Sequence, residues 1–180
     1  MAEKHWQQDP QRRARIENAT LDIIAAHGVA GTTYRKVAAA AGVPLSAVSY
    51  YFRSMDALLT AAFTRLADDT SLVFAERIST AHSTDDACAA VVDIIFGDTT
   101  SSSRTLLLSY ELYGFASRHP EMTSVMHTWM NKSRHALSRH FSKTATVAID
   151  ALIEGMTIHR SVIPVERQHV MRMVQQLAAL

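Results

Sequence analysis

Two short helical segments, separated by a Gly-Val-Pro turn, constrain this chain more than any other feature of its sequence. Thr33 is a residue type that caps the start of a helix, and small apolar side chains follow it at helical spacing. Gly42 can adopt the left-handed conformation of a tight turn, and Pro44 can begin a helix but cannot continue one. The sequence therefore predicts helices over about residues 34–41 and 44–52. This is the arrangement of a helix-turn-helix, whose second helix fits the major groove of DNA.

The rest of the chain also has the spacing of apolar side chains that is typical of α-helices, and strand-like alternation is nearly absent. We therefore expect an all-α protein, with an N-terminal three-helix helix-turn-helix domain over residues 1–54 and a C-terminal helical domain over residues 55–180. The two domains share the helix that begins near residue 56. The remaining helices are expected over about residues 10–27, from 56 to the upper sixties, 68–81, 84–97, 103–118, 120–142, 145–161 and 164–179.

Charge is distributed unevenly along the chain. Residues 1–66 carry eight Lys or Arg and five Asp or Glu, a net charge of +3, whereas the remainder carries ten basic and twelve acidic residues, a net charge of −2. A weakly basic N-terminal part on a weakly acidic body fits a unit that binds a polyanion. Random variation over so few charges is the competing interpretation.

The sequence also indicates where the protein works. Its single cysteine, Cys88, cannot form an internal disulfide, which favours a reducing compartment. The first fifteen residues are polar and charged, without the apolar segment of a secretory leader. Every apolar run is far shorter than the roughly 18 residues that a membrane span needs. We therefore expect a soluble, cytoplasmic protein with no membrane partner.

The second helix of the motif has one face suited to packing and one suited to DNA. On a helical wheel Val48 and Phe52 lie together and predict the buried face. Ser46, Ala47 and Tyr50 lie opposite and are expected to face outward. Serine hydroxyls can bond to base edges, a small alanine can touch a thymine methyl group, and a tyrosine hydroxyl can reach a phosphate. The outward face is therefore suited to a groove that is about 12 Å wide.

Five positions leave alternatives open. Leu45 either packs inward or makes an apolar contact with a base, and Tyr50 and Tyr51 either pack as ordinary aromatic side chains or reach the DNA. Lys36 opposes the dipole of its helix, which a phosphate would offset, and a solvated surface residue is the competing interpretation. Arg12 lies in a basic stretch that either contacts flanking phosphates or is simply solvated. The predicted DNA-binding residues are Arg12, Thr33, Arg35, Lys36, Pro44, Leu45, Ser46, Ala47, Ser49, Tyr50 and Tyr51.

This pattern resembles the N-terminal region of the TetR (tetracycline-repressor-like) family of transcriptional regulators. In that family a first helix ends in glycine and is followed by Thr-Thr, an alanine-rich helix, Ala-Gly-Val and an aromatic pair before Phe. The match spans about residues 12–66, and beyond it only helix count, length and the segment 111–122 agree in outline. The matching residues are Gly28, Thr32, Thr33, Val37, Ala38, Ala41, Gly42, Val43, Val48, Tyr50, Tyr51 and Phe52.

The resemblance implies a homodimer that places two recognition helices about one DNA turn apart on a palindromic operator. It also implies a C-terminal domain that holds an effector cavity and pairs its last long helices across a two-fold axis. Two positions depart from the family's pattern. The family often has tyrosine where this chain has Ser49, so the base preference should differ. It usually has lysine where this chain has Met55, which cannot donate to a phosphate; Arg53 is a candidate replacement.

Aromatic and methionine side chains of the C-terminal half predict a pocket for a small apolar or aromatic effector. Met122, Met126 and Met130 recur every four residues, and Met suits adaptable apolar sites. A plain hydrophobic core is the competing interpretation. Glu111 lies in an otherwise apolar segment, where its carboxylate either meets a cationic ligand or pairs with an Arg or His. The predicted pocket residues are Tyr110, Glu111, Tyr113, Met126, Trp129 and Met130.

The predicted dimer interface lies on the last long helices. Apolar residues of segment 145–161 fall on one face, and Gly155 permits the close approach of a second helix. The subunit's own core is the competing destination for these side chains. The predicted interface residues are Leu137, Phe141, Ile149, Leu152, Ile153 and Met156.

No pattern for catalysis or metal binding is visible. No two of the nine histidines are four residues apart, and the sequence has no glycine-rich phosphate loop, GxSxG or HExxH. We therefore expect no enzymatic activity, no cofactor and no metal. The leading hypothesis is a sequence-specific DNA-binding transcriptional regulator that acts as a repressor. The alternatives are an activator of the same family and a small-molecule binding protein without operator activity.

Overall fold

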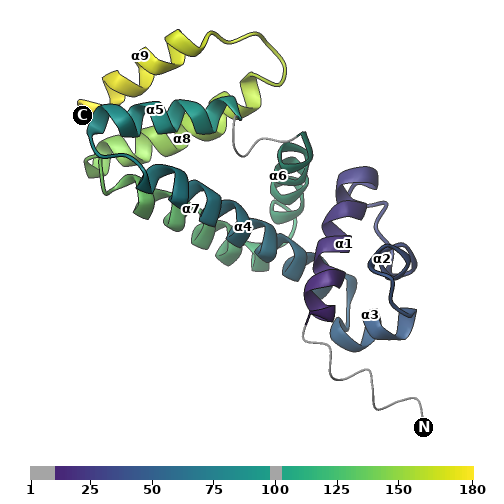
Figure 1. The fold of residues 1–180 in the computed structure, drawn as a ribbon. Coiled ribbons are helices and arrows are strands. Elements are labelled where there is room, and N and C mark those ends of the chain that lie inside the picture. Colours follow the sequence, from purple (N-terminus) through teal and green to yellow (C-terminus); the bar gives the residue numbers. More distant parts are fainter. Residues whose placement is uncertain (1–10, 98–102) are drawn as a thin grey trace.

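The computed structural model describes residues 11–97 and 103–180, and within these ranges every regular element is a helix. The elements are α1 (Arg12–His27), α2 (Tyr34–Ala41), α3 (Leu45–Tyr51), α4 (Met55–Ser79), α5 (Thr84–Phe96), α6 (Ser103–Ala116), the 3₁₀ helix η2 (Pro120–Met122), α7 (Thr123–Leu137), α8 (Lys143–His159) and α9 (Arg167–Ala178). Figure 1 shows α1–α3 at one end, with α4 leading from them into a body formed by α5 and α7–α9. The prediction of an all-α protein is therefore confirmed. Across the described residues, no helix combines the length and apolarity that crossing a membrane requires.

The three N-terminal helices pack around a small apolar core of their own. Ile16 of α1, Val37 of α2 and Val48 of α3 are fully buried in it. Leu58 of α4 is buried in the same core. Each of these side chains stabilises the unit by about 1.5–3 kcal/mol relative to leaving it exposed. The first residues of α4 therefore belong to the same packing unit as the helix-turn-helix.

Local hydrogen bonds fix the position of α3 on α2. The Thr33 hydroxyl accepts the backbone N–H of Lys36 at 3.3 Å and caps α2. Gly42 ends α2 with φ 63°, a left-handed conformation that favours glycine. The Tyr34 hydroxyl donates to the carbonyl of Phe52 at 2.8 Å, and burial raises the pKa of this tyrosine. The last bond joins the start of α2 to the end of α3, so the two helices keep one relative orientation.

Helix α4 is longer than predicted, because it runs without a break from Met55 to Ser79. The prediction of a helix end in the upper sixties and a new helix from residue 68 is therefore wrong. Leu66, Phe74 and Ile78 continue one buried stripe along the helix, and no glycine or proline lies between Met55 and Ser79 to stop it. This helix carries side chains of all three apolar clusters and joins the two ends of the molecule.

The predicted helix over residues 120–142 is divided into η2 and α7. Pro120 opens the 3₁₀ turn, and α7 ends at Leu137, five residues before the predicted end. The hydroxyl of Ser142 accepts the N–H of Ala145 at 3.1 Å and so starts α8 at Lys143. The early cap of α8 explains why the preceding helix is shorter than the periodicity of its side chains predicts.

A second apolar cluster, here called the central cluster, joins the N-terminal helices to the body. It brings α1, α4 and α6 together, with the Phe63 and Phe115 ring centroids 5.6 Å apart. Figure 1 shows α6 standing between α1 and the rest of the body. The buried members of the central cluster are Leu21, Ile24, Leu59, Ala62, Phe63, Leu66, Leu108, Leu112, Phe115, Met122 and Met126.

The methionine stripe belongs to this central cluster and not to a pocket. Met122 is fully buried, Met126 is 8% exposed, and Met130 packs against the same cluster. The prediction that Met126 and Met130 line an effector pocket is therefore wrong. Helix α7 lies along α4, and the interface between the two helices takes up the face on which these side chains lie.

A third cluster fills the far end of the body, where α5 packs on α8 and α9. Leu137, Phe141, Ile149 and Ile153 are buried in it, between 0% and 8% exposed. The prediction that these four side chains form a dimer interface is wrong, because buried side chains offer no surface to a second subunit. The other two predicted interface residues, Leu152 and Met156, are half-buried and pack against the same cluster.

Replacing Tyr34 by Phe should lower the free energy of unfolding by about 1 kcal/mol, because it removes one intramolecular hydrogen bond and leaves the Phe52 carbonyl without its partner. Urea denaturation followed by circular dichroism measures the difference. Tyr50→Phe is the matched control, since the Tyr50 side chain is 66% exposed and its change should stay within about 0.5 kcal/mol. Equal effects of the two substitutions would contradict the role given to the Tyr34 hydroxyl.

Candidate DNA-binding surface and effector cavity

Helix α3 presents one continuous face to solvent, on which polar and apolar side chains lie together. Leu45 and Tyr50 are 47% and 66% exposed, and Ser46 and Ser49 are exposed between them. Leu45 therefore takes the outward of its two predicted positions. Together with Pro44 at the N-cap, these residues form the outer face of the second helix of the helix-turn-helix. Nothing in the described part of the body covers this face.

Ala47 departs from the prediction, because it is only 1% exposed and does not face outward. A helix of seven residues that packs against two others buries two adjacent columns of side chains. One column holds Ala47 and Tyr51, and the other holds Val48 and Phe52. The helical wheel predicts burial of the second column alone. Ala47 is small because α3 lies close to its neighbours there, so it cannot contact a thymine methyl group.

The hydroxyl and aromatic groups of α3 already have intramolecular neighbours. The Ser49 hydroxyl donates to its own helix, with the carbonyls of Leu45 at 3.3 Å and Ser46 at 3.2 Å as acceptors. Its oxygen remains an acceptor for a base donor. Tyr51 is half-buried against the N-terminal core, and the Tyr50 ring meets it edge-on at 5.3 Å between centroids. Tyr51 thus serves packing first and holds Tyr50 outward.

The basic residues among the predicted DNA-binding residues lie on α1 and α2. Arg35 and Lys36 are exposed on α2, beside the capping residue Thr33. The Lys36 ammonium group donates to the carbonyl of Gly31 at 2.8 Å, so it closes back over its own loop. Arg12, at the start of α1, is half-buried. Arg35 is the most direct candidate for a phosphate contact, and Lys36 must leave its carbonyl partner to make one.

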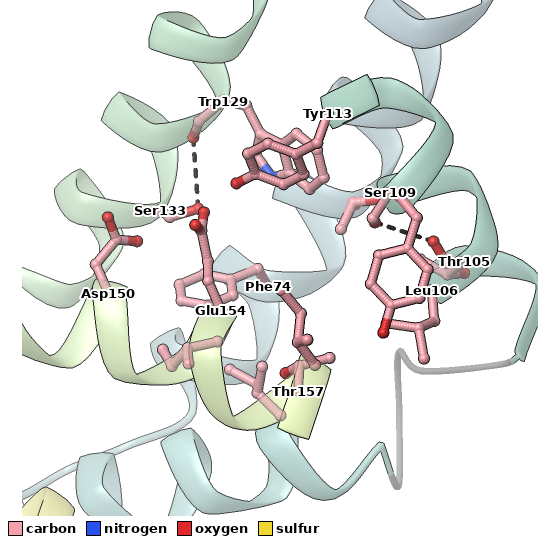
Figure 2. A pocket seen from close by; sticks show the side chains of 15 residues that line it. Phe74, Thr105, Leu106, Ser109, Tyr113, Trp129, Ser133, Asp150, Glu154 and Thr157 are labelled. Carbon is pink, nitrogen blue, oxygen red and sulfur yellow. Dashed lines mark hydrogen bonds between the residues drawn. The ribbon is translucent and has the colours of Figure 1, made fainter. Parts of the chain in front are cut away.

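A cavity of about 130 Å³ opens among α4, α5, α6, α7 and α8 in the body (Figure 2). Four aromatic side chains contribute to its wall, and hydroxyl groups and two carboxylates supply its polar atoms. Figure 2 shows the Glu154 carboxylate pointing toward the rings of Tyr113 and Trp129. The lining residues are Thr70, Phe74, Ile94, Thr105, Leu106, Ser109, Tyr110, Tyr113, Trp129, Ser133, Asp150, Ile153, Glu154, Thr157 and Ile158.

Three of the six predicted pocket residues line this cavity: Tyr110, Tyr113 and Trp129. Glu111 does not, and neither do Met126 and Met130. The lining residues of α4, α5 and α8, above all Asp150 and Glu154, were not predicted from the sequence. Their spacing of four on an otherwise apolar helix was the available signal, because two acids on the packing side of a helix need a structural or functional reason.

The two carboxylates of α8 have different surroundings. Asp150 is 5% exposed and accepts a hydrogen bond from the Arg134 guanidinium at 2.7 Å. Burial nevertheless raises the pKa of Asp150, because it outweighs the effect of Arg134. Burial against the cavity wall also raises the pKa of Glu154, a hydrogen bond from Tyr113 opposes this, and repulsion from Asp150 adds to it. Burial is likewise the main cause that raises the pKa of Tyr113.

Glu111 links the cavity helix α6 to the helix-turn-helix. Its carboxylate accepts the backbone N–H of Val29 at 3.0 Å, in the loop between α1 and α2. Gly28 directly precedes Val29, and a Cβ atom at Gly28 would stand 3.0 Å from the Glu111 carboxylate. A second link joins Arg104 of α6 to Asp22 of α1 at 2.6 Å. One face of α6 therefore lines the cavity, and the other holds α1.

An exposed second helix of a helix-turn-helix, carried on a helical body with an internal cavity, defines a helix-turn-helix transcriptional regulator. The model of the family described as bacterial regulatory proteins, tetR family, matches residues 16–62. SCO7518 from Streptomyces coelicolor A3(2), a candidate transcriptional regulator of known structure, is 39% identical and has a TM-score of 0.89, over 95% of this chain and 100% of that one. The chain belongs to the TetR family of bacterial regulatory proteins.

Other relatives agree with this assignment. The multidrug binding protein EbrR in complex with imidazole is 25% identical, with a TM-score of 0.77 over 96% of this chain and 97% of that one. The transcriptional regulator BetI 1 of Chromohalobacter salexigens is 26% identical over 165 residues, which are 86% of this chain and 81% of the relative. These similarities confirm the predicted family and the prediction of a DNA-binding transcriptional regulator.

Replacing Glu111 by Ala should lower the free energy of unfolding by about 1–3 kcal/mol, because the Val29 N–H loses its acceptor in a half-buried place. Hydrogen exchange at Val29 should accelerate at the same time. Glu111→Gln is the matched control, since its amide oxygen can still accept this bond. Unchanged exchange at Val29 in the Ala variant would show that the carboxylate does not hold the loop.

Proposed function

We propose that this regulator binds a palindromic operator as a homodimer, with residues 1–54 as the DNA-binding domain, and represses transcription in the cytoplasm. The observation that carries the proposal is the outer face of α3, with Leu45, Ser46 and Tyr50 open to solvent. The width of this face suits the major groove. Its side chains can donate and accept hydrogen bonds and can make apolar contacts with the bases. Repression follows if the bound dimer excludes the polymerase from the same DNA.

The contacts divide into those that specify sequence and those that position the dimer. Ser46, Ser49 and Tyr50 face the bases in this proposal, and Leu45 adds an apolar contact at the edge of the groove. Thr33, Arg35 and Lys36 at the start of α2 face the phosphates, as does Arg12 at the start of α1. Pro44 sets the direction in which α3 enters the major groove. Ala47 and Tyr51 support α3 from the side of the core.

The dimer interface in this proposal is the outer surface of α8 and α9. Val147, Ile158 and Met173 are 46%, 41% and 43% exposed there, an unusual share of large apolar side chains for a solvent face. Ala151 and Gly155 lie between them on α8, and a Cβ at Gly155 would meet nothing within 4 Å. A second α8 can therefore approach closely.

The cavity is the proposed effector site, and its walls favour a small aromatic molecule. EbrR, a structural relative of similar length, is described as a multidrug binding protein in complexes with imidazole and with malachite green. An occupant that displaces α6 would act on the N-terminal helices through Glu111, which bonds to the loop after α1, and through Arg104, which bonds to α1. Binding in the cavity and binding to DNA would then be coupled.

Replacing Tyr50 by Ala should weaken operator binding by about 1–3 kcal/mol, because the exposed ring and hydroxyl are lost while the fold is kept. A gel shift with fragments selected from genomic DNA measures it, at two salt concentrations, since affinity should fall steeply with salt. His127→Ala is the control, because this exposed residue of α7 lies outside both α3 and the proposed dimer interface. A protein that retains no DNA fragment would instead support a small-molecule binding protein without operator activity.

Replacing Val147 by Glu should convert the dimer into monomers, because two like charges would meet across the two-fold axis. Sedimentation equilibrium measures the mass, and circular dichroism checks that the helices remain. Thr144→Glu, one turn away at the start of α8, is a milder companion variant. A wild-type protein that sediments as a monomer refutes the proposed interface outright.

A further inference from the structure

The cavity is acidic as well as aromatic. Its described lining residues include two carboxylates, Asp150 and Glu154, and no Lys, Arg or His. Arg134 neutralises Asp150 through a direct bond at 2.7 Å. No described Lys or Arg forms an ion pair with Glu154, whose hydrogen-bond partner is the neutral hydroxyl of Tyr113. One negative charge of the cavity is therefore left without a cation.

The surroundings of the Glu154 carboxylate destabilise its negative charge. The pKa of Glu154 is raised above its ordinary value, first by burial against the wall and then by repulsion from Asp150, while Tyr113 and Arg134 oppose the rise only in part. A carboxylate in this state is stabilised by any cation that takes the place of water beside it. A neutral occupant would remove water from Glu154 without compensation, and an anion would add repulsion.

The aromatic walls favour the same kind of occupant. Phe74, Tyr110, Tyr113 and Trp129 line the cavity together with the carboxylates. The π-faces of such rings attract cations by about 0.5–2 kcal/mol each, and most strongly where the cation has lost its water. An organic cation can lose its water more easily than Na⁺ or K⁺, because its charge is spread over carbon.

The size of the cavity limits the occupant. Its volume of about 130 Å³ is close to that of a cavity that holds one benzene ring, roughly 150 Å³. Tyr110 and Tyr113 are 38% and 37% exposed, so the wall is open on their side and a longer molecule can extend outward. The enclosed part therefore holds about one ring, and the rest of the ligand extends toward the open side.

We propose that the cavity binds a small organic cation, with an ammonium or amidinium group attached to one aromatic ring, and that Glu154 is its counterion. Tyr113 and Trp129 provide the π-faces, and Phe74 and Ile153 contact the apolar part of the ligand. The inference rests on the proposed function only where it equates this ligand with the effector. Binding itself requires no operator.

Benzyltrimethylammonium is a suitable probe, because neopentylbenzene is its uncharged carbon isostere and phenylacetate is an anion of similar size. Isothermal titration calorimetry, or the change in Trp129 fluorescence, should show that the cation binds and that the isostere and the anion bind at least about tenfold more weakly. Glu154→Gln should lower the affinity for the cation about tenfold and should raise that for the isostere, because no carboxylate is left to lose its water. Glu76→Gln, an exposed glutamate of α4 outside the cavity, should change neither.

Tyr113→Leu provides a second test, since this residue lies at the open side of the cavity and its replacement spares the core. It should reduce the preference for the cation over the isostere. Equal binding of cation and isostere by the wild-type protein would overturn the inference, as would an unchanged cation affinity in Glu154→Gln. A gel shift without any ligand tests the operator separately, so cation binding without DNA binding would leave this inference standing and refute the proposed function.

Discussion

The packing of α6 against α1 and α4 in the central cluster is the constraint on which the rest of this structure depends. Leu108, Leu112 and Phe115 of α6 are buried against Leu21 and Ile24 of α1 and Phe63 of α4. Without this contact the three N-terminal helices would be connected to the body only through α4. Because the contact is apolar and close-packed, a displacement of α6 cannot be absorbed locally and must move α1 as well.

Helix α6 therefore has two faces with different roles. Tyr110 and Tyr113 line the cavity, while Glu111 and Arg104 hold the loop after α1 and α1 itself. The cavity-lining residues and the residues that bond to the N-terminal helices therefore lie on the same few turns of α6. This arrangement gives the proposed effector site and the proposed DNA-binding surface a shared rigid element, which is what coupling between two sites requires.

Much of the fold could be predicted from the sequence, because its signals are local. The cap at Thr33, the turn at Gly42 and the helix start near Pro44 depend only on neighbouring residues, and the bounds predicted for α2 agree with the structure. Helix α4 was predicted too short, because polar residues such as Asp68 and Asp69 interrupt its apolar pattern while its buried stripe continues beyond them. The aromatic half of the cavity, Tyr110, Tyr113 and Trp129, was identified, and the acidic half was not.

The sequence by itself determined that the chain is helical, where its helix-turn-helix lies, and the family to which it belongs. Only the tertiary structure decided which apolar side chains became core and which remained exposed. Ala47 and Ile149 became core, whereas Val147 and Tyr50 stayed exposed. The tertiary structure also decided that Glu111 holds the loop between α1 and α2, while Glu154 lines the cavity. The physical reason is that burial and pairing depend on segments distant in sequence, such as α4 against α7 and α1 against α6, and helical periodicity carries no information about these partners.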